Sequence, residues 1–218
     1  MRPRRSSQRG GLAPAGLLLL LLAACLAAPA RTAQRRPGGA PAATKPAPAV
    51  AGWYTNPVFD FDFPDPTVIR ATDGWFYAYA TQAIVEGRMH NFQCARSRDA
   101  VRWERMPDPL PYKPAWADQT QSFWAPDVHQ RGETFFMYYS AVLNPEAAAR
   151  FKREQGAAES REDVFCLGVA RSQAPAGPFI DSGRPMKCGL SFVNIDPMAF
   201  DDPKTGKKLL YWGSGFQP

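Results

Sequence analysis

Short apolar and aromatic runs, separated by glycine-bearing turns, recur along the chain after residue 52. Three stretches, 65–79, 125–139 and 195–212, each contain a run of β-forming residues, a turn with glycine and a second such run. This pattern predicts a β-hairpin in each stretch. In the first two repeats a third run follows and ends in Ala-Arg-Ser, at 95–97 and 170–172.

A fourth run with an aromatic residue completes the first two repeats, at 101–106 and 178–180. Four strands in each repeat are typical of a β-propeller blade. The third repeat stops after its second run, because the sequence ends at Pro218. We therefore expect an all-β fold over 53–218 with about two and a half propeller blades. We also expect the sequence to be truncated and the natural product to continue.

One segment of the second repeat departs from the strand pattern. Residues 144–163 are Ala-rich and charged, and a proline stands at position 145. Since proline is favoured in the first turn of a helix, we expect a short surface helix that begins at Pro145. We interpret its charges as a solvated face rather than a binding patch.

Residues 1–51 differ in composition from the rest of the chain. Arginines at 2–9 precede an apolar run at 17–24, which is too short to span a bilayer comfortably. A basic start followed by such a run is typical of a secretory signal. The folded part is therefore expected to work outside the cytoplasm.

Two cleavage points compete within this signal. One follows Ala30, after a run of small residues, and the other precedes Cys25, because Leu22 to Cys25 resembles the lipobox of bacterial lipoproteins. We favour the second, with a signal peptide at 1–24, lipidation of Cys25 and an Ala/Pro-rich linker at 25–52. In the alternative, Cys25 is one more small residue of an ordinary secretory signal.

The basic residues of the chain are concentrated in the leader. The first 51 residues hold eight of the 26 Lys and Arg residues and no Asp or Glu, which leaves 18 basic against 20 acidic residues. The remainder is nearly neutral, so nucleic-acid binding, which needs a basic face on the folded domain, loses its main support. All 27 aromatic residues follow residue 52 and suffice for one core, so disorder throughout is excluded.

If the first cysteine carries a lipid, three others remain: Cys94, Cys166 and Cys188. One disulfide can form in an oxidising compartment, but the spacing does not determine which two cysteines pair. No pair has metal-ligand spacing, so we expect no zinc site. His90 and His129 also show no partner spacing, and we interpret both as structural.

Register along the predicted first strands distinguishes two aspartates. Asp65 lies nine residues before the turn glycine of its hairpin and Asp196 lies ten before its own, and each precedes a proline. The first strands of propeller blades line the central channel, so residues in equivalent positions converge there. In the second blade we place Phe123 and Trp124 at this position. We interpret Asp127, deeper along that strand, as a structural hydrogen-bond acceptor.

A channel entrance with two carboxylates and an aromatic residue has the composition of a sugar site. An aromatic face stacks on a sugar ring, and two acids can cleave a glycosidic bond. Each residue also has a structural interpretation, because Asp-Pro is a common turn pair and Phe123 and Trp124, taken alone, are more often core residues. The matched register of Asp65 and Asp196 favours the functional interpretation.

Three motifs, in order along the chain, carry a family resemblance. The motifs are Asn56-Pro57-Val58 with Phe63-Pro64-Asp65-Pro66-Thr67, then Phe123-Trp124-Ala125-Pro126-Asp127, then Asn194-Ile195-Asp196-Pro197. They resemble glycoside hydrolase family 43 and its arabinanases and β-xylosidases over essentially all of residues 53–218. The resemblance implies a five-bladed β-propeller that hydrolyses glycosidic bonds with inversion. It also implies that Asp65 is the general base that activates water, and that Asp196 orients the general acid and raises its pKa.

The chain departs from the family pattern at one functional residue. The family's general acid is a glutamate in a later blade, whereas the last glutamate here, Glu162, precedes the Asp196 motif. We expect the full-length protein to be an inverting glycosidase that acts on arabinose- or xylose-containing plant cell-wall polysaccharides or oligosaccharides. The chain alone is then expected to be inactive or nearly so.

Two other functions fit parts of the sequence. A carbohydrate-binding propeller without catalysis is the alternative that the missing glutamate favours. A protein-binding propeller of the kind found in intracellular scaffolds is disfavoured by the secretory leader and by the paired Asp-Pro strand starts.

No cofactor is evident in the sequence. A structural calcium ion occurs in some members of the family, but no ligand set is visible here. We expect a monomer that binds a carbohydrate substrate, has no nucleic-acid partner, and meets a membrane only through a lipid on Cys25.

Overall fold

The computed structural model describes residues 54–120 and 122–213. The predicted signal peptide at 1–24, the lipidation site Cys25 and the linker at 25–52 lie outside these residues and stay predictions. The described residues all fall within one compact unit of the chain, Ala47–Pro218. Within them, we find no helix with the length and apolar character needed to cross a membrane.

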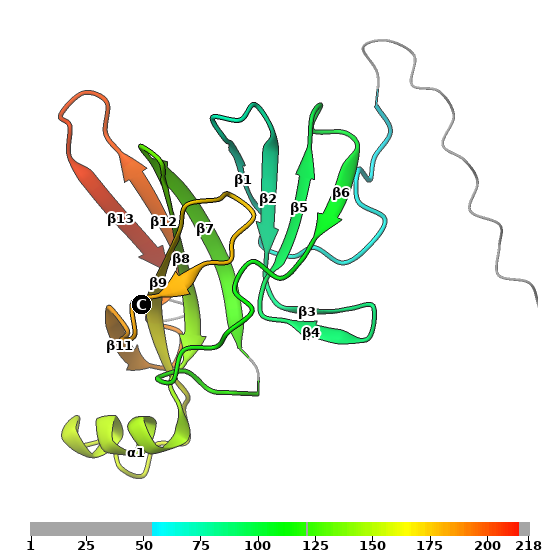
Figure 1. Cartoon of the computed structure of the whole chain (residues 1–218). Coiled ribbons are helices and arrows are strands. Elements are labelled where there is room, and N and C mark those ends of the chain that lie inside the picture. Colours follow the sequence, from blue (N-terminus) through cyan, green and yellow to red (C-terminus); the bar gives the residue numbers. More distant parts are fainter. Residues whose placement is uncertain (1–53, 121, 214–218) are drawn as a thin grey trace, which may run out of the picture. The chain divides into compact units, whose positions relative to one another are not determined.

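The first sheet has four antiparallel strands in the order β1-β2-β5-β6 (Figure 1). These strands are β1 (Thr67–Arg70), β2 (Phe76–Ala80), β5 (Gln93–Ser97) and β6 (Trp103–Met106). A separate hairpin, β3 (Ala83–Val85) and β4 (Arg88–His90), lies between β2 and β5 in the chain. The predicted first repeat is therefore confirmed, including a third strand that ends in the Ala-Arg-Ser run.

The second sheet has five strands rather than the four that the repeat predicts. Its strands are β7 (Phe123–Arg131), β8 (Thr134–Val142), β9 (Val164–Ser172), β10 (Ile180–Asp181) and β11 (Lys187–Leu190). Both β10 and β11 pair with β9. The strand β10 pairs with the C-terminal part of β9, and β11 pairs with its N-terminal part. The fourth strand of this sheet is thus divided into two short pieces.

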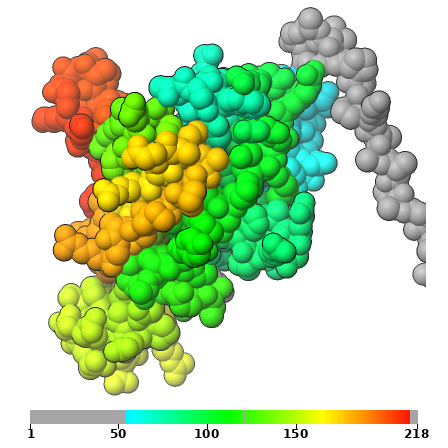
Figure 2. Space-filling view, in the orientation of Figure 1, coloured from blue at the N-terminus to red at the C-terminus, as the bar shows by residue number. Residues whose placement is uncertain are grey.

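The expected helix of the second repeat is present as α1 (Pro145–Glu154). The side chain of Asn144 caps it by accepting a hydrogen bond from the Ala147 amide at 2.9 Å, and Pro145 occupies the first turn. None of its residues is buried, and its segment stands out from the sheets in the space-filling view (Figure 2). This confirms the predicted surface helix.

The third sheet is a hairpin of β12 (Ile195–Asp201) and β13 (Lys208–Gly213). Its first strand contacts β7, and β7 in turn contacts β1, so the first strands of successive sheets are neighbours. The described residues form an all-β fold with one helix. The five-bladed ring stays a prediction.

The core between the first two sheets is aromatic. Tyr139 lies at its centre, with the rings of Phe92, Phe123 and Trp116 at centroid distances of 5.4, 5.9 and 6.1 Å. Tyr139 of β8 pairs directly with Gly168 of the neighbouring strand β9. A Cβ added to Gly168 would lie only 2.4 Å from the Tyr139 ring. A glycine is needed there because any side chain would overlap that ring.

A disulfide joins Cys166 of β9 to Cys188 of β11, which are directly paired in the sheet. The sequence left this pairing open. Cys94 is a buried free thiol whose pKa burial raises to about 12. Such a thiol stays protonated and is inert at neutral pH.

Two polar clusters connect the sheets. The Asp127 carboxylate accepts the Thr67 hydroxyl at 3.1 Å and the Ala199 amide at 2.7 Å, and so links β1, β7 and β12. The predicted role of Asp127 as a structural acceptor between strands is confirmed. His129 lies 3.4 Å from the Asp201 carboxylate, so this histidine is also a structural contact between β7 and β12.

Candidate functional site

The three sheets share a residue with unusual backbone geometry immediately before a proline, which we call the pre-proline position. It is held by Asp65, Ala125 and Asp196, whose φ angles of 51°, 43° and 53° are left-handed. The pairing of β7 with β8 shifts register between Trp124 and Asp127 as a result, and that of β12 with β13 shifts between Ile195 and Met198.

The register gives Asp65 and Asp196 equivalent positions, as their spacing predicted. The residue of the second sheet at this position is Ala125, and not Phe123 or Trp124 as we expected. Counting back from the turn glycine misled that assignment, because the turn between β1 and β2 is longer than the turn between β7 and β8. The repeated proline would have given the correct alignment.

The two carboxylates interact electrostatically. Partial burial, followed by the negative charge of Asp65, raises the pKa of Asp196 above its ordinary value. A like charge nearby disfavours ionisation of Asp196, so Asp65 lies close enough to act on it.

Neighbouring hydroxyl groups hold the two aspartates in place. The Thr81 hydroxyl donates to Asp65 Oδ2 at 2.6 Å and accepts from the Ala125 amide at 2.9 Å. The Ser140 hydroxyl accepts from the Asp196 amide at 3.0 Å. Nothing in the sequence pattern singled out Thr81 or Ser140, because their partners lie in neighbouring sheets.

The structure contradicts the predicted sugar-binding role of Phe123. Its side chain has 0% exposure, packs between Phe92 and Tyr139, and lies 4.1 Å below the ammonium group of Lys113. Successive strand residues point to opposite faces, so Phe123 enters the core while its neighbour Trp124 turns away from it. The ring of Phe123 is therefore not accessible to a substrate.

Trp124 directly precedes the pre-proline residue Ala125 and is half-buried. Its ring lies 4.6 Å from that of Phe165 and 6.0 Å from that of Phe192, and the two phenylalanine rings are 5.1 Å apart. The assignment of Trp124 as a sugar platform stays a prediction. The two phenylalanines beside it were not anticipated.

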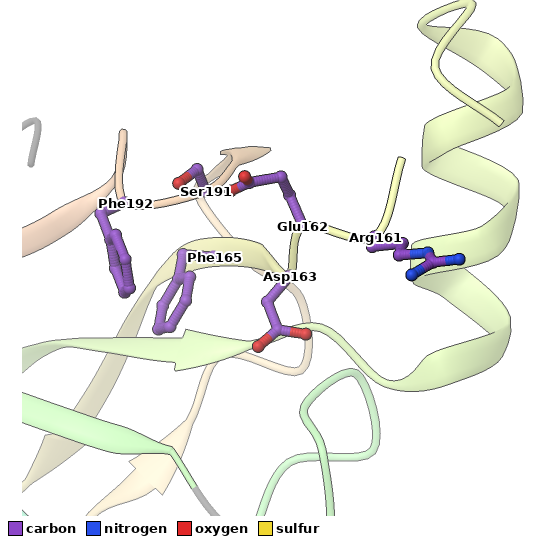
Figure 3. A pocket seen from close by; sticks show the side chains of 6 residues that line it. All are labelled: Arg161, Glu162, Asp163, Phe165, Ser191 and Phe192. Carbon is purple, nitrogen blue, oxygen red and sulfur yellow. The ribbon is translucent and has the colours of Figure 1, made fainter. Parts of the chain in front are cut away.

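A pocket of about 360 Å³ adjoins this aromatic cluster. Figure 3 shows the rings of Phe165 and Phe192 side by side, with Ser191 and Glu162 near one another and Arg161 directed toward the helix. Asp163 completes the lining. The three charged residues at the end of the insertion are exposed, which agrees with the interpretation of its charges as a solvated face, and they also border this pocket.

The described residues offer no cluster of three His, Cys, Asp or Glu side chains that could hold a metal ion. The arrangement at the pre-proline positions provides one pair of interacting carboxylates with an aromatic residue close to the second sheet's equivalent position. Carboxylates can transfer a proton, and an aromatic side chain can stack on a ring.

Comparisons with known proteins agree with this geometry. The model of glycosyl hydrolases family 43 matches residues 54–217. A xylosidase/arabinosidase 43A of Humicola insolens is 29% identical over 94 residues, which are 43% of this chain and 22% of the relative. A xylosidase/arabinosidase of Bacteroides ovatus is 23% identical over 138 residues, which are 63% of this chain and 31% of the relative.

The fold is similar to that of a thermostable family-43 glycoside hydrolase of known structure. The TM-score is 0.55 at 26% identity, over 74% of this chain and 45% of the other. The chain therefore spans less than a third of each of these curated relatives and under half of the solved one. Because the family model matches well over half of its residues, the chain belongs to glycosyl hydrolase family 43.

Proposed function

We propose that the full-length protein is an inverting glycosidase acting on xylose- or arabinose-containing plant cell-wall polysaccharides or oligosaccharides. The observation that carries this proposal is the pair Asp65 and Asp196, which share one strand position and interact through their charges. Membership of family 43 supports hydrolysis, and the names of the two curated relatives support the sugar class.

In the proposed mechanism Asp65 is the general base. Its Oδ2 is held by the Thr81 hydroxyl, which leaves Oδ1 to accept a proton from the attacking water. The water attacks the anomeric carbon opposite the leaving oxygen, and a general acid protonates that oxygen. Inversion requires about 6.5–9.5 Å between base and acid, which leaves room for the water.

Asp196 acts on the general acid in this scheme. A second carboxylate near the acid disfavours its ionisation and keeps its proton available for the leaving group. No glutamate of this chain matches the family's acid, so we place the acid in a part of the protein beyond these residues. Trp124, beside the pre-proline position of the second sheet, is the proposed platform for the sugar ring.

We further propose that the complete fold is a five-bladed propeller, of which this chain supplies about two and a half blades. One face of the β12–β13 hairpin supports this, since Met198, Phe200 and Tyr211 are 48%, 41% and 53% exposed on it. The first sheet presents an apolar hollow of about 690 Å³, lined in part by Phe59 and Trp103. Further blades would cover both apolar faces.

The glycosidase proposal is tested with Asp65→Asn in the full-length protein. We expect this variant to lose nearly all release of reducing ends from xylan and arabinan, because the amide cannot accept the proton of water. Affinity electrophoresis in gels that contain these polysaccharides should show retained binding. Undiminished turnover would remove Asp65 from the role of base.

The absence of a matching acid favours a second candidate for the 218-residue chain by itself, a carbohydrate-binding module without catalysis. Retardation in xylan or arabinan gels with no release of reducing ends would support it. Release of reducing ends by the chain alone would refute it, and would mean that a residue within this chain serves as the acid.

The proposed protein acts outside the cytoplasm as a monomer, either secreted or anchored by a lipid on Cys25. The lipobox resemblance of Leu22 to Cys25 supports the anchor. In cells grown with a radiolabelled fatty acid, we expect label in the parent and none in Cys25→Ala. An unlabelled parent would leave an ordinary secretory signal with cleavage after Ala30.

A further inference from the structure

A second repeated position faces the pre-proline position across each hairpin. In the second and third sheets the residue before the pre-proline residue pairs with Ser140 and with Gly213. In the first sheet the Thr81 amide donates to the Pro64 carbonyl at 3.1 Å, which gives Thr81 the same register. We call Thr81, Ser140 and Gly213 the facing position.

The hydroxyl group at this position forms hydrogen bonds that connect neighbouring sheets. In the first two sheets it accepts the amide of the pre-proline residue in the next sheet, at 2.9 Å for Thr81 and 3.0 Å for Ser140. Thr81 also donates to the carboxylate of its own sheet, Asp65, at 2.6 Å. One threonine therefore fixes a site carboxylate and joins two sheets.

The third sheet has glycine where the first has threonine. A Cβ built on Gly213 would lie 3.7 Å from Asp196 Oδ2 and 3.6 Å from the Ile195 carbonyl, which are ordinary contact distances. Space for a small side chain is therefore present, and only the hydroxyl is missing. In the described part of the chain, no hydrogen bond reaches the carboxyl oxygens of Asp196.

We propose that the facing position sets the different roles of the two equivalent aspartates: Thr81 is a positioning residue that fixes the Asp65 carboxylate, and Gly213 withholds a donor from Asp196. This inference rests on the proposed function, since the difference has catalytic meaning only if both aspartates take part in hydrolysis. A fixed base presents one oxygen to water, whereas a carboxylate without a hydroxyl donor keeps its full negative charge to act on the neighbouring general acid.

The electrostatics of Asp196 agree with this assignment. Its pKa is raised by partial burial and by Asp65, which is the charged group that acts on it among the described residues. A hydroxyl donor would stabilise the ionised form and oppose both effects. Glycine at the facing position therefore leaves the negative charge of Asp196 without a hydroxyl donor to offset it, and such a charge acts more strongly on a neighbouring general acid.

The test is Gly213→Ser, with Gly213→Ala as the matched control that adds the Cβ but no hydroxyl. The Asp196 carboxyl is titrated by carbon-13 NMR in the 218-residue chain, and urea unfolding verifies that both variants fold. We expect serine to lower the titration midpoint of Asp196 by about one pH unit relative to alanine. Equal midpoints in the two variants would overturn the proposal.

A second pair of variants examines Thr81. Thr81→Val removes the hydroxyl at nearly constant volume, and Thr81→Ser keeps it. We expect amide hydrogen exchange at Ala125 to become about tenfold faster in the valine variant and to change little in the serine variant. Equal exchange in both would refute the bridging role of the hydroxyl. Neither measurement requires hydrolysis, so the proposal can fail while the glycosidase assignment holds, or the reverse.

Discussion

The charge of Asp65 acts on Asp196, and this effect can be measured directly. In Asp65→Asn the negative charge disappears, so we expect the pKa of Asp196 to fall toward its ordinary value, although burial still raises it. A carbon-13 carboxyl titration of the parent and variant measures this change. A pKa of Asp196 that is unchanged in the variant would mean that burial alone accounts for the shift.

At the scale of single residues, the sequence correctly predicted the features that depend on spacing within a short segment. Asp65 and Asp196 were aligned correctly because both precede proline at similar distances from a turn. Phe123 was assigned wrongly because the count back from the turn glycine did not allow for the shorter turn between β7 and β8, and its side chain lies in the core. Thr81 could not be found at all, since its role depends on the Ala125 amide of another sheet.

The disulfide is the main covalent constraint on the second sheet. It ties β11 to β9 across a sequence separation of 22, and loops of that size stabilise by about 3 kcal/mol when closed. We expect Cys188→Ser to lower the free energy of unfolding by about this amount. Urea unfolding with and without a reducing agent measures it.

The reducing agent supplies the control for this prediction. It should destabilise the parent to the level of Cys188→Ser and leave that variant unaffected. A parent that is insensitive to reduction would show that β11 is held by its backbone pairing with β9 alone.

At the scale of elements, helix and hairpins followed from local signals. Pro145 and the polar residues around it predicted α1, because helix initiation depends on neighbouring residues. The division of the fourth strand into β10 and β11 was missed. Its cause lies in pairing with the two ends of the long strand β9, which no short window of sequence contains.

The relation between whole sheets depends on a few partly buried polar contacts. Asp127 is central among them, because it lies on β7 and receives hydrogen bonds from Thr67 of the first sheet and Ala199 of the third. Sequence reasoning identified it as a structural acceptor, but its partners are 60 and 72 residues away in the chain. Long-range pairing of this kind can be recognised only in the folded protein.

Removing the Asp127 carboxylate should weaken the contacts among all three sheets. Asp127→Ala leaves the Ala199 amide without its acceptor in a buried part of the fold, so we expect a loss of about 2 kcal/mol or more in the free energy of unfolding. Thr67→Val removes only one of the two hydrogen bonds and should cost less. Urea unfolding ranks the variants, and amide exchange at Ala199 locates the effect. If Asp127→Ala left that exchange unchanged, the contact between β7 and β12 would be maintained by the packing of their apolar side chains, and the sheets would not depend on this carboxylate for their alignment.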